Sequence, residues 1–127
     1  MTYGFSKTTD LPFDEAVERT TAELQKEGFG VLTTIDVKET LKKKLNVNFR
    51  RYKILGACNP PFAHAALQAD EEIGLLLPCN VIVYEKEGNS VVAAFDPLSM
   101  TAFVDKPEIA HIAEEVHRRL ERVVAAL

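Results

Sequence analysis

The sequence predicts an α+β domain of two layers, in which helices cover one face of a mixed or mostly antiparallel sheet. Segments with period-two alternation of apolar residues are interleaved with segments of helical spacing, which is the first observation behind this class. The second is composition: the chain has 127 residues, 46% of them hydrophobic and 27% charged, as in ordinary globular proteins. A chain of this length fits a single domain, here residues 1–127.

The first strand and the first helix are predicted near the N-terminus. Residues 2–9 mix β-branched and aromatic residues in loose alternation, which indicates a strand. Residues 10–28 have helical spacing. Asp10 and Pro12 stand where helix start signals occur, and Gly28 stands where a left-handed residue ends a helix. The expected buried stripe of this helix is Phe13, Val17, Thr20 or Thr21, and Leu24.

A second strand and a second helix are expected between residues 29 and 45. Asp36 and Glu39 have the spacing of a capping box, which begins a helix. The helix that follows has apolar residues four positions apart, so these positions are predicted to be buried. The expected apolar positions are Phe29, Val31, Thr33 and Ile35 on one face of the strand, and Val37, Leu41 and Leu45 on the helix.

The third strand, residues 49–58, ends at the first of two cysteines. Tyr52, Ile54 and Cys58 share one of its faces by period two. Asn59 followed by Pro60 is typical of a helix N-cap and first helical residue. The alanine-rich residues 60–70 are therefore predicted to be a helix.

The last third of the chain predicts a pair of strands, a short segment and a long helix. Residues 75–96 form the two strands, joined at Glu87-Gly88-Asn89, with Pro78 at an edge, a bulge or the true strand start. Asp96-Pro97 repeats the cap-then-proline signal before the short segment. Asp105 and Pro107 open the final helix. Its apolar stripe is Ile109, Ile112, Val116, Leu120, and Val123 or Val124.

The predicted order is therefore β-α-β-α-β-α-β-β-α. Helices with one apolar stripe need a sheet face to cover, and placing them on one side of the sheet satisfies that need. The strand near residues 75–84 is too hydrophobic for a solvated face. A second copy of the chain is the expected cover, which predicts a homodimer.

The net charge, the lengths of the apolar runs and the N-terminal residues limit the expected class of protein and its location. The net charge of −4 argues against nucleic-acid binding, although seven bases and one acid give +6 between Lys38 and Lys53. No apolar run approaches the ~20 residues of a membrane span. The first ten residues lack the features of a signal peptide. The expectation is a cytoplasmic protein whose two cysteines are free thiols.

Four stretches resemble a known family of bacterial and archaeal proteins. They are "EGFGVLTTIDVKETLKKKLNVNF", "YKILGACNP", "ALQADEEIGLLLPCNVIVYE" and the closing helix. The chain is similar, from about Phe13 to Leu127, to the family called domain of unknown function 302. The resemblance implies a small two-layer α+β fold, like the TATA-binding-protein class in topology alone and often dimeric. It implies that Cys58-Asn59-Pro60 and Pro78-Cys79-Asn80 belong to a shared pattern, and it brings no agreed activity.

The two Cys-Asn pairs form the main candidate site. A strand, a helix and a returning strand bring Cys58 and Cys79 to adjacent strand ends if the strands are antiparallel. Cys58 would lie near a helix N-terminus, whose dipole lowers a thiol pKa. Reactive thiols flanked by Asn59 and Asn80 are one interpretation. The other is that the cysteines are apolar core fillers, with the asparagines serving as cap and turn residues.

A metal site and an anion site are weaker hypotheses. His64 could join the two cysteines as a third metal ligand, but the chain has no CxxC motif and no closed set of four ligands, so we predict no metal and no cofactor. A solvated or otherwise satisfied His64 is the alternative. The candidate anion site consists of Lys42, Lys43, Arg50 and Arg51. These residues could equally be a solvated helix face followed by charges that protect a strand edge.

Three functions remain open from the sequence. The first is a homodimeric domain that binds a small ligand near the strand ends of Cys58 and Cys79. The second is a thiol-dependent enzyme or redox protein that uses one of these cysteines. The third is a pure protein-interaction module. No motif of a nucleophile elbow, a phosphate-binding loop, a dinucleotide fingerprint or a zinc protease is present in the sequence.

Overall fold

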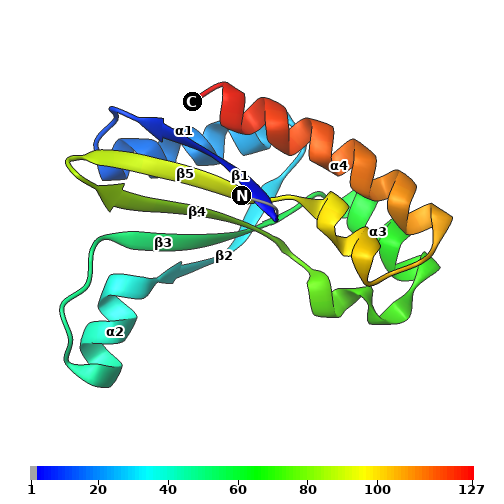
Figure 1. Cartoon of the computed structure of the whole chain (residues 1–127), viewed down its shortest axis with the longest axis horizontal. Coiled ribbons are helices and arrows are strands. Elements are labelled where there is room, and N and C mark those ends of the chain that lie inside the picture. Colours follow the sequence, from blue (N-terminus) through cyan, green and yellow to red (C-terminus); the bar gives the residue numbers. More distant parts are fainter. Residues whose placement is uncertain (1–2) are drawn as a thin grey trace.

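A computed structural model describes residues 3–127, so Thr2, where the predicted first strand began, lies outside the described residues. The elements alternate along the chain as shown in Figure 1. The strands are β1 (Gly4–Thr9), β2 (Gly30–Asp36), β3 (Tyr52–Cys58), β4 (Cys79–Lys86) and β5 (Asn89–Phe95). The helices are α1 (Phe13–Lys26), α2 (Val37–Leu45), α3 (Pro60–Ala69) and α4 (Pro107–Ala125), with the 3₁₀ helices η1 (Glu71–Leu76) and η2 (Pro97–Ala102).

The five strands form one sheet in the order β1-β5-β4-β3-β2, with every neighbouring pair antiparallel. The α+β class is therefore confirmed. The β4–β5 hairpin turns through Glu87 and Gly88, which have φ values of 52° and 82°. Two central residues with positive φ suit a tight turn, because their twist matches that of the strands. In the part of the chain that the structure describes, no helix combines the length and apolar character needed to cross a membrane.

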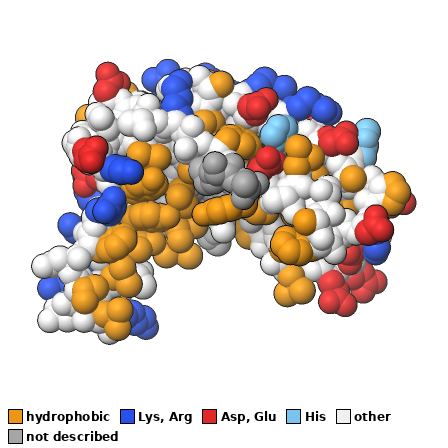
Figure 2. All heavy atoms as spheres, viewed as in Figure 1, with side chains coloured by type: hydrophobic (Ala, Val, Ile, Leu, Met, Phe, Trp, Pro, Cys, Tyr) orange, Lys and Arg blue, Asp and Glu red, His pale blue; other side chains and the backbone are white. Residues whose placement is uncertain are grey.

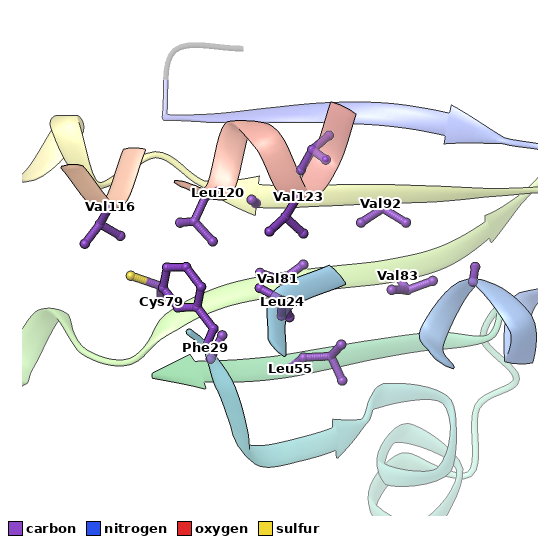
Figure 3. Packing of buried hydrophobic residues seen from close by; sticks show 14 of the residues in the cluster. Leu24, Phe29, Leu55, Cys79, Val81, Val83, Val92, Val116, Leu120 and Val123 are labelled. Carbon is purple, nitrogen blue, oxygen red and sulfur yellow. The ribbon is translucent and has the colours of Figure 1, made fainter. Parts of the chain in front are cut away.

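Helices α1 and α4 pack on one face of the sheet, which we call the covered face (Figure 1). Their apolar stripes are those expected from the sequence, with Leu24 and Leu120 fully buried. The strands contribute every second side chain to this core. Figure 3 shows Cys79, Val81 and Val83 of β4 in a row beneath α4. The hydrophobic effect of this burial holds the two layers together.

The opposite face, which we call the open face, has no helix lying across it. By the register of the strands, it carries the alternate residues of β4, which are Asn80, Ile82 and Tyr84. Tyr84 stacks on Tyr52 of β3, with ring centroids 5.3 Å apart and planes inclined by 11°. Figure 2 shows hydrophobic side chains across the hollow underside of the molecule, between the projecting helix α2 and the opposite end. Apolar side chains on this face are therefore partly exposed to solvent.

The predicted burial of α2 is wrong. The capping interaction is present, because Asp36 Oδ1 accepts a hydrogen bond from the backbone N–H of Glu39 at 2.9 Å. The helix nevertheless has no buried residue, and Leu45 is 65% exposed. The reason is tertiary: α2 leaves the end of β2 and projects away from the two layers (Figure 1).

The predicted apolar face of β2 is also wrong in part. Pairing with β3 shifts by one residue between Val31 and Thr33, which leaves Leu32 as an extra residue. A bulge of this kind turns the later side chains to the opposite face. Phe29 is buried, whereas Ile35 is on the open face opposite Ile54 and is exposed.

Two element boundaries differ from the expectation. Leu75 and Leu76 belong to η1, so the strand predicted from residue 75 begins at Cys79, directly after Pro78. Helix α1 has Pro12 at its N-cap position and no side-chain cap, so the start signal at Asp10 is not used. The left-handed stop after α1 is confirmed, because Gly28 has φ of 88°.

Candidate functional site

An apolar cavity of about 330 Å³ lies where β3 ends and β4 begins. Helices α3 and α4, with η1 and η2, complete its walls. Two of its lining residues, Leu32 and Leu67, are exposed, so the cavity opens to solvent on their side. The residues that carry its chemistry or shape its walls are Cys58, Asn59, Cys79, Phe62, Ala63 and Ile73.

The structure brings both cysteines to this cavity. Cys79 lies directly opposite Ala57 in the antiparallel pair of β3 and β4, and Cys58 follows Ala57 along β3. The adjacent strand ends expected from the sequence are therefore present. Both cysteines are free, Cys58 being half-buried and Cys79 buried.

Burial changes the chemistry of Cys79. Desolvation in the apolar core, together with the neighbouring Cys58, raises the pKa of the Cys79 thiol to about 11. A buried thiolate is disfavoured because it loses the solvation that water provides. Cys79 is therefore a neutral thiol at physiological pH, and a neutral thiol is a weak nucleophile.

Asn59 occupies the N-cap position of α3, as expected, but its side chain does not cap the helix. Its Nδ2 atom donates to the backbone carbonyl of Glu27 at 3.3 Å. A Cβ atom on Gly28 would lie 2.9 Å from the same Nδ2 atom, so glycine permits this close approach. Asn59 is 7% exposed and connects the start of α3 to the end of α1. The hydrogen bond from its amide therefore holds the start of α3, which forms part of the cavity wall, against the end of α1.

Asn80, the fourth predicted residue, does not reach the cavity. It follows Cys79 in β4, and successive residues of a strand point to opposite faces. Asn80 is exposed and lines a second hollow, on the open face, together with Leu75, Ile82 and Phe95. The two Cys-Asn pairs thus place three residues at one cavity and the fourth at the other.

The four basic residues of the predicted anion site do not come together. Lys42 and Lys43 line a shallow hollow on α2 that also contains Asp36 and Glu39. Arg50 lines a separate hollow beside Glu85 and Glu87 at the β4–β5 hairpin. The remaining residue, Arg51, pairs with Asp14, and its guanidinium lies 4.4 Å from the centre of the Phe13 ring.

His64 and the two cysteines do not assemble into a metal site. His64 is exposed on α3, outside the lining of the cavity. Within residues 3–127, no group of three or more His, Cys, Asp or Glu side chains has an arrangement that could hold a metal ion. The two cysteines lie instead among the mostly apolar side chains that line the cavity.

Sequence reasoning missed most of the cavity wall. Met100, Ile109 and Ala113, from η2 and α4, line it together with Ile73 of η1. Apolar spacing identified Ile109 as a buried residue. The same spacing occurs where a helix packs against a filled core and where it forms the wall of a cavity. No local signal separates the two, because the cavity depends on how segments far apart in sequence pack.

The fold and the cavity define a class: a small α+β domain with an antiparallel sheet, one face covered by helices, and an apolar cavity at the strand ends. The model of the family described as "Domain of unknown function DUF302" matches residues 5–127, and the chain belongs to this family. A crystal structure of an uncharacterised conserved protein DUF302 from Bacillus stearothermophilus is similar, with a TM-score of 0.90 and 28% identity over 98% of each chain. No curated protein matches the chain.

Proposed function

We propose that this protein is a homodimeric domain that binds a small, uncharged, apolar ligand in the cavity beside Cys58 and Cys79. One observation carries the proposal: among the described residues, the cavity lining contains no ionisable side chain apart from the two thiols. Burying a charged ligand there would cost several kcal/mol with no partner to offset it, on the order expected for unpaired charges. An alkyl or aromatic group would lose no hydrogen bonds.

The size of the cavity limits the ligand. A cavity of roughly 150 Å³ lined by apolar side chains accommodates benzene. The present volume of about 330 Å³ is roughly twice as large. We therefore expect a ligand of about two fused rings or an alkyl chain of similar volume. Ligand pockets of this size are mostly apolar, with few polar groups to set orientation.

Binding is favoured over thiol catalysis at this site. A nucleophilic cysteine needs a base or a cationic neighbour that promotes its thiolate. The pKa of Cys79 is raised to about 11 by burial, which is the opposite of activation. Two free thiols are typical of the reducing cytoplasm, which supports the cytoplasmic location included in this proposal.

The homodimer is supported by the open face of the sheet. Ile35, Leu75 and Phe49 are all more than a third exposed, and the face between them carries Ile54 and Ile82. Large contiguous apolar surfaces on a soluble domain are typical of interaction sites. A two-fold axis through this face would cover both copies at once.

The ligand proposal is tested by thermal unfolding with naphthalene, 1-octanol and octanoate at equal free concentrations. A ligand that binds the native state alone raises its stability by RT ln(1 + [L]/Kd). We expect naphthalene and 1-octanol to raise the melting temperature in proportion to log concentration. Octanoate, which carries a charge, should raise it less. Equal shifts for all three, or none, would contradict the proposal.

Two variants of α3 locate the binding. Ala63→Leu places a larger side chain in the cavity wall, and Ala65→Leu makes the same change on the same helix at a half-buried residue outside the lining. We expect the first variant to lose the naphthalene shift and the second to keep it. If both variants keep the shift, the ligand binds elsewhere. A protein that dimerises but binds no apolar ligand would be an interaction module.

A further inference from the structure

The two ends of the open face carry opposite charge. One end is α2, which has four lysines and one acid between Val37 and Leu45. At the other end, Asp70 caps η1 and is followed by Glu71 and Glu72. Figure 2 shows basic side chains on the projecting α2 and acidic side chains at the opposite lower end, with the hydrophobic underside between them.

Most of these charges lack a partner in the chain. Within residues 3–127, none of the four lysines of α2 forms an ion pair, and neither Glu71 nor Glu72 does. Asp70 is the exception, because its Oδ2 lies 3.8 Å from Lys106 Nζ. Both ends therefore retain charge that a second molecule can neutralise.

The two ends also differ in shape. Helix α2 projects away from the layers with no buried residue and with Leu45 exposed. At the η1 end, the open face has a hollow of about 410 Å³, lined mainly by apolar side chains that include Leu75, Pro78 and Phe95. A projection at one end and a hollow at the other are complementary.

Symmetry relates these features. A two-fold axis parallel to the sheet, and perpendicular to the line joining its ends, places α2 of each copy against η1 of the other. An axis along that line would instead place α2 against α2, bringing eight lysines together. Like charges in juxtaposition are unfavourable, whereas opposite charges attract and fix the register of an interface. Charge therefore selects the first axis.

We propose that two copies of this chain clasp each other reciprocally, with α2 of each copy docked in the hollow beside η1 of the other. The proposal rests on the homodimer proposed above and specifies its geometry. The open faces meet at the centre, and the two clasps, each pairing lysines with Glu71 and Glu72, form the ends. Each contact occurs twice, as a closed two-fold dimer requires.

Charge reversal tests the clasp. One variant carries Lys42→Glu and Lys43→Glu, and the other carries Glu71→Lys and Glu72→Lys. Sedimentation equilibrium at low salt measures the dimer dissociation constant. Each variant replaces attraction by repulsion at both clasps, so we expect the dissociation constant to rise at least tenfold, with a smaller change at 1 M salt because charges are then screened.

Mixing the two variants gives the decisive result. In the first variant both ends are acidic, and in the second both ends are basic. A heterodimer of the two restores opposite charges at both clasps. We therefore expect an equimolar mixture to dimerise with an affinity near that of the wild type. The control variant carries Glu15→Lys and Glu18→Lys on the exposed side of α1, which repeats the charge change of the second variant away from the open face.

The outcomes separate the two proposals. A wild-type protein that remains monomeric at 100 µM would have a dimer dissociation constant well above the micromolar range, and this result would overturn the homodimer and the clasp together. A wild-type dimer whose dissociation constant is unchanged by either reversal would leave the homodimer standing and overturn the clasp. So would a mixture that forms no heterodimer, or a control that weakens the dimer equally.

Discussion

The two faces of strand β4 differ in what covers them more than in their composition. Toward the helices, Val81 and Val83 are completely buried. Toward the open face, Ile82 and Tyr84 are only half-buried, although Ile82 is as apolar as either valine and both side chains are larger. One set of amphipathic helices can cover one face. An apolar strand therefore does not identify its own cover, which can come from the same chain or from another molecule.

The largest expected effect tests the covered face. Leu120→Ala removes a fully buried side chain from the centre of α4, and we expect the free energy of unfolding to fall by about 3–5 kcal/mol. Leu45→Ala on α2, at a leucine that is 65% exposed, should change the stability of the monomer by less than about 0.5 kcal/mol. Urea unfolding at several protein concentrations measures both.

The two leucine variants differ further in their dependence on concentration. Leu120→Ala should lower stability by a similar amount at every concentration. Leu45→Ala should weaken only the concentration-dependent part, because this part reports the proposed dimerisation. A large loss of monomer stability in Leu45→Ala would show that α2 belongs to the core and would break the contrast between the faces.

The next effect concerns the thiol on the covered face. The pKa of Cys79 is raised from 9.0 to about 11, so folding favours its protonated form. The corresponding stability is complete below pH 9 and is lost as the pH rises through 11. Two pH units correspond to about 2–3 kcal/mol. Urea unfolding between pH 8 and pH 11 should show this loss.

Tyr52 also affects stability at high pH, because burial and the neighbouring Tyr84 raise its pKa. The comparison is therefore with Cys79→Ala, which keeps this tyrosine and lacks the thiol. We expect the variant to lose less stability than the wild type between pH 9 and pH 11. Parallel pH profiles would show that the Cys79 thiol is not buried as described.

The third prediction concerns a closely packed part of the open face around Gly56. A Cβ atom on Gly56 of β3 would collide with Thr33 Oγ1 and lie 2.9 Å from Pro78 Cγ. A Cβ atom on Gly30 of β2 would meet nothing within 4 Å. We expect Gly56→Ala to cost about 1–3 kcal/mol in thermal or urea unfolding. Gly30→Ala should stay within about 0.5 kcal/mol, and equal costs would contradict this packing.

Much of the fold followed from local patterns. The apolar stripe of α4 correctly identified its buried face, because residues three or four positions apart lie on the same side of a helix. Gly28 marked the end of α1 and Asp36 the start of α2. Patterns of this kind depend on residues a few positions apart. The bulge at Leu32 and the detachment of α2 depend on what lies alongside, so the same patterns led to wrong faces there.

The candidate site divides in the same way. The sequence was enough to predict that Cys58 and Cys79 lie at adjacent strand ends, because one helix connects two neighbouring strands. The separation of Asn80 from Cys79 also follows from strand alternation, a signal that was available in the sequence. The hydrogen bond from Asn59 to Glu27 joins residues 32 positions apart and could not be read from either segment.

The sequence by itself determined the types of element, the stripes of α1 and α4 and the placement of both cysteines at strand ends, because backbone geometry and hydrophobic periodicity act over short distances. Only the tertiary structure decided that the cysteines border a cavity, that Asn80 lies across the sheet from it, and that α2 projects from the domain. These features depend on the packing of distant segments, in which each surface is shaped by its neighbours.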